Sequence, residues 1–217
     1  MNGQLKICLT GGIACGKSLL SHYLNAFGVE TIDADDIVHE LIPDPAARKR
    51  LAAEVFADPA KRRALEAKIH PIVKERIDNR IIELSNNRMN ERDLSSFHST
   101  QHPPFAHSSL HPFNHSPLRP FDNSIIPPIA IIPLLFEAHW EKNFDIICCV
   151  VSERETQISR MMTTRGYTRA EAEARLAAQM PVAEKAAKSH YVIHNDGTPD
   201  ELKEEVKKFL TWVSTLS

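Results

Sequence analysis

A glycine-rich segment near the N-terminus is the feature that most constrains what this chain of 217 residues can fold into. Residues 11–18 read GGIACGKS and fit the pattern G-x-x-x-x-G-K-[ST]. An apolar run, residues 4–10, precedes the segment, and residues 17–27 have helical spacing. Glycine at these positions lets consecutive backbone N–H groups converge on phosphate oxygens, because no Cβ atom stands in the way. The segment therefore predicts a phosphate-binding loop between a strand and a helix.

The residues of this loop predict how a nucleotide is held. Lys17 can neutralise charge on the β and γ phosphates, the helix N-terminus adds its positive end, and the hydroxyl of Ser18 can ligate Mg²⁺. The residues before them offer backbone N–H groups. The residues expected to bind the nucleotide here are Gly12, Ile13, Ala14, Cys15, Gly16, Lys17 and Ser18, with Ser18 also as the metal ligand.

The remaining apolar runs predict a parallel sheet. Residues 29–32, 129–135, 146–151 and 191–194 join the first run as expected strands. Most of these runs are continuous and do not alternate with polar residues, as in strands that are covered on both faces. Because helical segments separate them, the order predicts an α/β fold with a doubly wound, parallel five-stranded sheet.

Several signals predict where the helices begin. Asp58 followed by Pro59 opens a helix that we expect to reach about Leu84. The pattern S/T-x-x-E, typical of a capping box, begins at Ser152, Thr168 and Thr198. We therefore expect these three side chains to cap helices.

Composition excludes several classes of protein. Lys and Arg number 26 against 28 Asp and Glu, and the formal charge of −2 gives no basic excess that would attract nucleic acid. The N-terminus carries no secretory signal pattern, and no apolar run approaches the roughly 18 residues that cross a bilayer. The four cysteines show neither CxxC nor zinc-site spacing. We expect a cytoplasmic protein without membrane or nucleic-acid partners and with buried, reduced thiols.

A low-complexity stretch, residues 95–124, interrupts the alternation. Phenylalanine recurs every eight residues, at positions 97, 105, 113 and 121, among many Ser, His and Pro residues. Proline prevents a continuous helix, and we interpret the stretch as an insertion. An alternative role, weak transition-metal binding, is less favoured because zinc sites usually need a preformed tetrahedral shell. Its candidate ligands are His98, His102, His107, His111 and His115.

Two carboxylates and two arginines complete the predicted chemistry. Asp33 and Asp35 follow the second expected strand, at the edge where open α/β sheets bind ligands. In an extended segment they would share one side, so that one can act as a base or an indirect metal ligand; alternatively Asp35 caps the next helix. Arg160 and Arg165, followed by Gly166, are typical of a mobile lid that brings charge to a transferring phosphoryl group. Alternatively, they offset the charge of a helix C-terminus.

With these motifs the chain resembles the dephospho-CoA kinase family, which phosphorylates the ribose 3′-hydroxyl of dephospho-CoA with ATP in the last step of coenzyme A synthesis. PLLFE and IHP are far more specific for this family than the phosphate-binding loop. The matching segments, in family order, are LTGGIACGKS (9–18), IDAD (32–35), LEAKIHP (65–71), IIPLLFE (131–137), Arg160 with Arg165, AAQM…EK (177–185) and VIHNDGT (192–198).

The resemblance implies a P-loop kinase fold with a helical substrate lobe and a lid, in a single domain of 1–217. Its parts are a core (1–34, 125–155 and 188–217), a CoA-binding lobe (35–94), the insertion (95–124) and a lid (156–187). The resemblance also implies ATP and Mg²⁺ as cofactors, dephospho-CoA as the small-molecule partner, and a monomer or weak homo-oligomer.

For the site, the resemblance implies that Asp33 takes the proton of the 3′-hydroxyl and that Asn195 lies near the adenine of ATP. His70 is implied to contact the substrate; alternatively, it stabilises a bend before Pro71. The residues implied to act in catalysis are Asp33, Lys17, Arg165 and Arg160, and those implied to bind dephospho-CoA are Asp35, His70 and Leu134.

Two departures from the family leave alternatives open. Part of the substrate lobe after Leu41 is missing relative to the family, and the insertion stands where the family has a short connection. The alternatives are another small-molecule or nucleotide P-loop kinase, or an ATP-binding paralogue with an impaired substrate lobe.

Overall fold

Five parallel strands form the centre of the molecule, for which the computed structural model describes residues 5–97 and 126–216. Their order in the sheet is β2-β3-β1-β4-β5, and every neighbouring pair is parallel. This confirms the predicted sheet, but β3 ends before the apolar run 129–135 does, because Pro133 has no N–H group for the ladder. The strands are β1 (Ile7–Gly11), β2 (Thr31–Asp33), β3 (Ile129–Ile131), β4 (Ile146–Val151) and β5 (Tyr191–His194).

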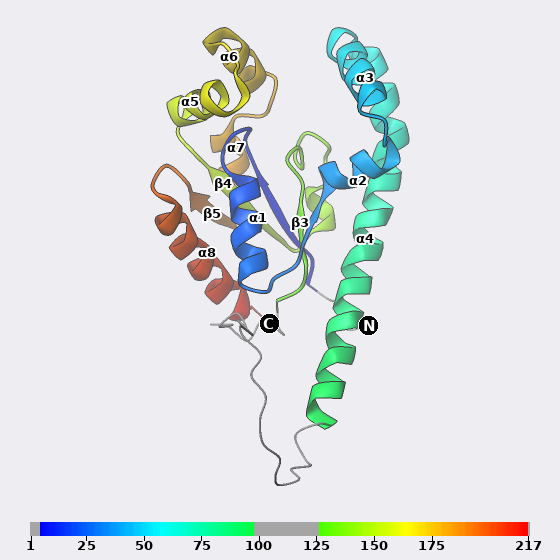
Figure 1. The fold of residues 1–217 in the computed structure, drawn as a ribbon, viewed down its shortest axis with the longest axis vertical. Helices are drawn as coiled ribbons and strands as arrows, with labels where there is room; N and C mark the ends of the chain where they lie inside the picture. Colours follow the sequence, from blue (N-terminus) through cyan, green and yellow to red (C-terminus); the bar gives the residue numbers. More distant parts are fainter. Residues whose placement is uncertain (1–4, 98–125, 217) are drawn as a thin grey trace, which may run out of the picture.

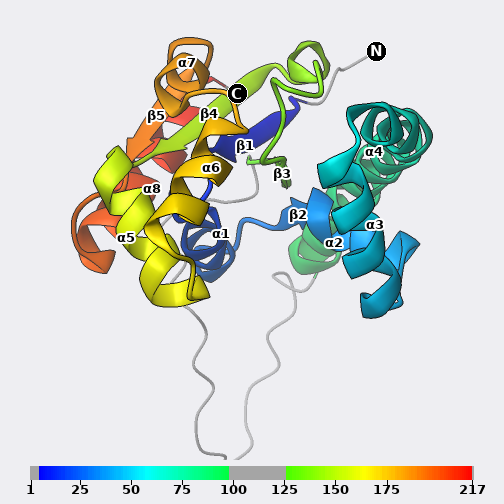
Figure 2. The ribbon, with the colours of Figure 1, turned by 90° about the horizontal axis from the view of Figure 1, so that it is seen from above.

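Helices cover both faces of the sheet (Figure 1). Helices α1 and α8 pack together on one face, and α2 and α4 pack on the other, beside β2 and β3 (Figure 2). A short 3₁₀ helix, η2 (Glu141–Asn143), precedes β4. The helices are α1 (Lys17–Ala26), α2 (Ala34–Leu41), α3 (Pro45–Ala57), α4 (Pro59–Phe97), α5 (Arg154–Arg165), α6 (Arg169–Ala177), α7 (Val182–Ala187) and α8 (Pro199–Ser214).

The core explains why the strand sequences are continuously apolar. Successive side chains of a strand point to opposite faces. Ile7 and Leu9 join the cluster that includes Leu24 of α1 and Phe209 of α8, whereas Cys8 joins the cluster that includes Ile77 of α4. Apolar side chains therefore cover both faces of the sheet, as predicted for a doubly wound sheet.

The cysteines are part of this core. Cys8, Cys15, Cys148 and Cys149 are all buried and free, which confirms the expected reduced thiols. Burial raises the pKa of all four, that of Cys149 to about 12. These thiols are therefore uncharged packing groups.

Two of the three predicted capping boxes are present. The Thr168 and Thr198 side chains each accept from the backbone of the third helical residue, and each glutamate there bonds back. The prediction for Ser152 is wrong: α5 begins at Arg154, and the Ser152 hydroxyl donates to the Asn195 carbonyl at 2.7 Å. A tertiary hydrogen bond takes the place of the local cap.

Helix α4 is longer than expected. Asp58 caps its N-terminus as predicted, with its Oδ1 accepting from the Ala60 N–H at 2.8 Å. The helix then passes through Pro71 and runs to Phe97, beyond the expected end near Leu84. Residues 95–97 of the expected insertion are therefore helical.

Two groups of helices lie beside the carboxyl ends of the strands (Figure 1). Figure 1 shows α5 and α6 on one side of the carboxyl ends of the strands, and α3 with the start of α4 on the other. Helix α5 begins two residues before the expected lid boundary at 156. The rest of the insertion, including all five candidate metal-ligating histidines, lies outside the described residues. None of the helices within 5–97 and 126–216 combines the length and apolarity needed to cross a membrane.

Candidate active site

The glycine-rich loop joins β1 to α1, and its last glycine is required by its surroundings. Gly16 has a φ of +91°, in the left-handed region that glycine adopts freely. A Cβ atom at Gly16 would collide with the side-chain amide of Asn195. That amide, directly after the end of β5, donates from Nδ2 to the Cys15 carbonyl at 2.9 Å and so holds the loop. A larger residue at position 16 would break this contact.

Lys17 lies along the loop. Its Nζ donates to the carbonyls of Gly11 at 3.0 Å and Gly12 at 2.8 Å. Burial lowers the pKa of Lys17, and the nearby ammonium group of Lys185 lowers it too. Ser18 follows at the start of α1 with an exposed side chain. The loop thus presents a cation and a hydroxyl beside its backbone N–H groups.

A cavity of about 670 Å³ opens beside the loop. It brings together predicted residues from four separate segments of the chain. Those that line it are Ile13, Ala14, Gly16, Lys17, Ser18, Asp33, Asp35, Arg160, Arg165 and Asn195. Gly12 and Cys15 do not line it, and the Cys15 thiol points into the core, 3.1 Å from Nε2 of Gln157.

Asp33 and Asp35 both line this cavity, but not in the predicted arrangement. Asp33 is the last residue of β2 and the N-cap of α2, and its Oδ1 accepts from the Asp35 N–H at 2.8 Å. Asp35 lies in the first turn of α2, so the two do not share one side of an extended segment and Asp35 is not the cap. Burial raises the pKa of Asp33, and the Asp35 N–H bond opposes this. Asp33 is therefore a better base than an ordinary exposed aspartate.

The two arginines that were predicted to belong to a lid, Arg160 and Arg165, differ in their surroundings. Arg160 donates from Nη1 to the Ser152 hydroxyl at 3.1 Å and to the Ala14 carbonyl at 3.4 Å. Arg165, at the last position of α5, is exposed on the cavity side before Gly166, whose φ is +67°. Arg160 is thus tied to the loop, whereas Arg165 is exposed to solvent and lines the cavity.

A second, smaller cavity of about 230 Å³ lies next to the first. Asp35, His70 and Leu134, the three predicted substrate-binding residues, all line it, with mainly apolar neighbours. His70 packs edge-on against Trp140 with ring centroids 5.0 Å apart, and Leu134 is 44% exposed. Asp35 and Pro133 line both cavities. The two cavities therefore share part of their walls.

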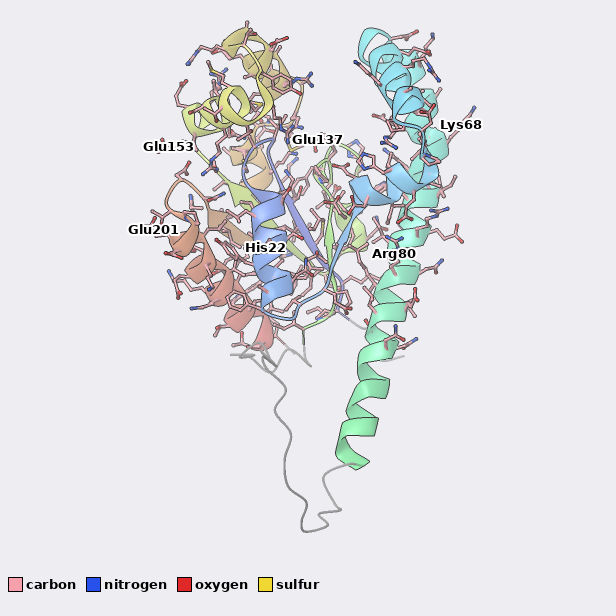
Figure 3. All side chains as sticks on the ribbon, viewed as in Figure 1. His22, Lys68, Arg80, Glu137, Glu153 and Glu201 are labelled. Atoms are coloured by element: carbon pink, nitrogen blue, oxygen red, sulfur yellow. The ribbon has the colours of Figure 1, made fainter. Side chains whose placement is uncertain are left out.

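Four polar residues beside the cavities had no predicted role. Gln157 and Gln179 both hydrogen bond to Ile13, and Glu137 forms a 2.8 Å ion pair with Lys185. Glu137 lies at the end of the sheet towards the lid helices (Figure 3). Gln157 shares a face of α5 with Arg160, a spacing visible in the sequence, but the partners of all four come from distant segments.

The donor set suits a magnesium ion better than a soft metal. Ser18, Asp33 and Asp35 offer a hydroxyl and carboxylates at one cavity, the hard oxygen ligands that Mg²⁺ prefers. Mg²⁺ usually keeps several waters and phosphate oxygens, so a few protein oxygens suffice. In the described ranges, no group of three or more His, Cys, Asp or Glu residues could form a self-sufficient metal cage.

Comparison with known proteins identifies relatives of this chain. The family model described as dephospho-CoA kinase matches residues 5–47 and 111–201. The dephospho-CoA kinase of Geobacter sulfurreducens is 33% identical over 225 residues, which cover 93% of this chain and 95% of the relative. That of Synechococcus sp. (strain JA-3-3Ab) is 33% identical, with 94% and 90% covered.

Solved structures share the fold. Dephospho-CoA kinase from Campylobacter jejuni superposes with a TM-score of 0.56 at 21% identity, covering 97% of each chain. Shikimate kinase from Bacteroides thetaiotaomicron gives 0.51 at 12% identity, covering 97% of this chain and 98% of that one. At these identities the likeness concerns the fold alone, that of P-loop kinases.

Proposed function

The chain belongs to the dephospho-CoA kinase family, and we propose that it transfers the γ-phosphoryl group of ATP to the ribose 3′-hydroxyl of dephospho-CoA. The products are coenzyme A and ADP. The O–H bond of the acceptor and the bond from the γ-phosphorus to the bridging oxygen break, and a bond from the 3′-oxygen to phosphorus forms. This is the last step of coenzyme A synthesis.

The observation that carries the proposal is the junction of the two cavities. The larger one contains the charged groups of a phosphate site, and the smaller one is mainly apolar, as a pantetheine chain or an adenine requires. Asp35 and Pro133 border both. An acceptor in the small cavity would thus present its hydroxyl where the phosphate site begins, which is the positioning that phosphoryl transfer depends on.

Charge neutralisation is the task of the loop and the lid. The loop amides and Lys17 would hold the β and γ phosphates, because the ammonium group lies along the loop already. Arg165 would approach the transferring group from the cavity mouth. Arg160 would fix the loop through Ala14 while its own side chain borders the cavity. Asn195 would support the loop from the adenine side.

Proton removal is the task of Asp33. Its raised pKa makes its carboxylate more basic, and its place at the end of β2 borders the phosphate cavity. Asp33 would accept the hydroxyl proton as the new bond forms. Ser18, with Asp33 or Asp35 acting through water, would hold Mg²⁺, which when bound supplies further neutralisation of phosphate charge.

A coupled assay for ADP release tests the proposal. Dephospho-CoA, AMP, CMP and pantetheine phosphate are offered side by side with ATP and Mg²⁺. We expect turnover with dephospho-CoA and little with the others. Lys17→Ala should abolish turnover, while Lys203→Ala, at an exposed position on α8, serves as the matched control and should keep it.

The same assay separates the alternatives. Faster turnover of AMP or CMP would indicate a nucleotide kinase, and tight ATP binding without any product would indicate a paralogue with an impaired substrate lobe. Family membership over most of the chain disfavours both. Cytoplasmic location and a monomeric or weakly oligomeric state stay predictions of the sequence.

A further inference from the structure

Ile13, near the tip of the glycine-rich loop, is held on both sides by glutamines of the lid. Nε2 of Gln157 donates to the Ile13 carbonyl at 2.7 Å, and Oε1 of Gln179 accepts from the Ile13 N–H at 3.1 Å. The Ile13 side chain packs against Ile158 and Met161 of α5. The tip of the loop is therefore bound to the lid through its backbone and its side chain.

The two glutamines have different surroundings. Gln157 is 3% exposed, and burying its amide without hydrogen bonds would be costly, so it serves the loop alone. Gln179 is half-buried and lines the phosphate cavity. Because the Ile13 N–H can only donate, the side-chain oxygen of Gln179 must face it. This hydrogen bond fixes the orientation of the Gln179 side-chain amide.

Gln179 is joined by one peptide bond to Met180, which hydrogen bonds to Glu137. The Met180 N–H donates to Oε1 of Glu137 at 3.0 Å, and the same oxygen pairs with Nζ of Lys185 at 2.8 Å. Nζ of Lys185 also donates to the Pro133 carbonyl at 2.8 Å. The peptide between 179 and 180 is planar and stiff. An unbroken series of short contacts thus runs from Ile13 to Pro133, which lines both cavities.

We propose that Gln179 is a positioning residue that couples the two cavities, so that ATP and the acceptor strengthen each other's binding. The identity of the acceptor, dephospho-CoA, rests on the proposed function. A ligand that orders one end of the series, Ile13 or Pro133, also orders Gln179 and Met180. The second ligand then binds to a segment that is already ordered, which gives positive coupling. By linkage, each ligand must raise the affinity of the other by the same factor.

Binding measurements on four proteins test this coupling. Isothermal titration gives the Kd of a non-hydrolysable imido analogue of ATP, with Mg²⁺, in the absence and presence of saturating dephospho-CoA. Gln179→Met removes the acceptor of the Ile13 N–H at nearly constant size. Ala178→Met places the same side chain at the exposed neighbouring position, and Gln157→Met breaks the other hydrogen bond of Ile13 without touching the 179–180 segment.

We expect dephospho-CoA to tighten binding of the analogue about fivefold or more in the parent, the lower range of measured couplings. Gln179→Met should reduce this factor below about twofold, and Ala178→Met should keep it. Gln157→Met should weaken binding of the analogue but keep the factor by which dephospho-CoA tightens it. If the coupling depended only on how firmly the loop is held, Gln157→Met would reduce this factor too. Melting curves verify that each variant is folded.

The outcomes also separate this inference from the proposed function. A coupling that is equal in the parent and in Gln179→Met overturns the inference, and so does a parent that phosphorylates dephospho-CoA without any coupling. A Gln157→Met variant that loses the coupling as fully as Gln179→Met overturns it as well. A parent that neither binds nor phosphorylates dephospho-CoA overturns the proposed function instead, because there is then no acceptor to couple.

Discussion

Removing the ion pair between Lys185 and Glu137 should weaken the junction between α7 and the segment after β3. Lys185 on α7 is fully buried, and its Nζ lies 2.8 Å from Oε1 of Glu137 and 2.8 Å from the Pro133 carbonyl oxygen. Lys185→Met preserves much of the volume and removes the charge. It leaves the Glu137 carboxylate without its cation.

The magnitude follows from burial. Breaking a buried pair by removing one partner costs about 3–5 kcal/mol, because the remaining charge is uncompensated. Oε1 of Glu137 keeps the Met180 N–H as a donor, and this hydrogen bond offsets part of the cost. We therefore expect Lys185→Met to lower the free energy of unfolding by about 3 kcal/mol, at the lower end of that range. Glu137→Gln should cost more, because Lys185 has no exposed surface and its charge would stay buried.

The double variant Lys185→Met with Glu137→Gln decides whether charge pairing is the cause. Since it leaves no buried charge, its destabilisation should be smaller than the sum of the single effects by about 0.5–3 kcal/mol, the size of coupling expected for residues in contact. Lys208→Met is the matched control, because its 2.7 Å pair with Glu205 lies at the surface, and the urea midpoint should stay essentially unchanged.

Urea unfolding followed by both tryptophan fluorescence and circular dichroism measures these free energies. Trp140 reports on the loop after β3 and Trp212 on α8, so coincident transitions by the two methods support a two-state treatment. A loss below about 1 kcal/mol in Lys185→Met, or additive effects in the double variant, would refute the argument from burial.

The phosphate site offers three further predictions. Asp33→Asn should lower kcat about 10²-fold or more and remove the acid limb of the pH–rate profile. Burial raises the pKa of Asp33, and only its ionised form is a base. The acid limb of the parent should therefore lie at a higher pH than an ordinary aspartate would give. If the acid limb persists in Asp33→Asn, another group causes it. Gly16→Ala should weaken ATP binding, since the left-handed backbone costs about 1–2 kcal/mol for a residue with Cβ and that atom would displace Asn195; equal Kd values by titration calorimetry would contradict this. Arg165→Met should lower kcat at unchanged Tm, whereas Arg160→Met should lower both, because Arg160, unlike Arg165, bonds to the loop; equal losses of Tm in the two variants would contradict this difference.

Local patterns were sufficient to predict most of the fold. The apolar runs locate all five described strands, because a strand covered on both faces must be apolar throughout. The errors have different causes, of which only the one at Ser152 is a tertiary contact. Pro133 ends β3 early, and Ser152 bonds to Asn195 instead of capping α5. The length of α4 was underestimated because residues after Leu84 are polar and show no apolar face that would predict a continued helix.

The candidate site was predictable where its residues lie within one motif. The loop, Asp33 and the lid arginines come from patterns with known chemistry, and all of them reach one cavity or its loop. Their supporting contacts were not predictable. Gln179 and Gln157 meet Ile13 across sequence separations of 166 and 144 residues, and no local spacing specifies such a pairing.

The lid arginines show why a correct motif still leaves roles undecided. The first half of α5 is fixed to the core: the Glu153 N–H donates to Oδ1 of Asp196 at 2.8 Å, and Gln157 and Arg160 bond to the loop. Arg165 lies five residues beyond Arg160, about 7.5 Å further along a rigid helix axis at 1.5 Å per residue. The anchored turns therefore aim the exposed guanidinium group of Arg165 without contacting it. Both arginines carry the same charge, belong to the same motif and line the same cavity, so only their hydrogen-bond partners distinguish them: Arg160 bonds to Ala14 of the loop, whereas Arg165 is exposed.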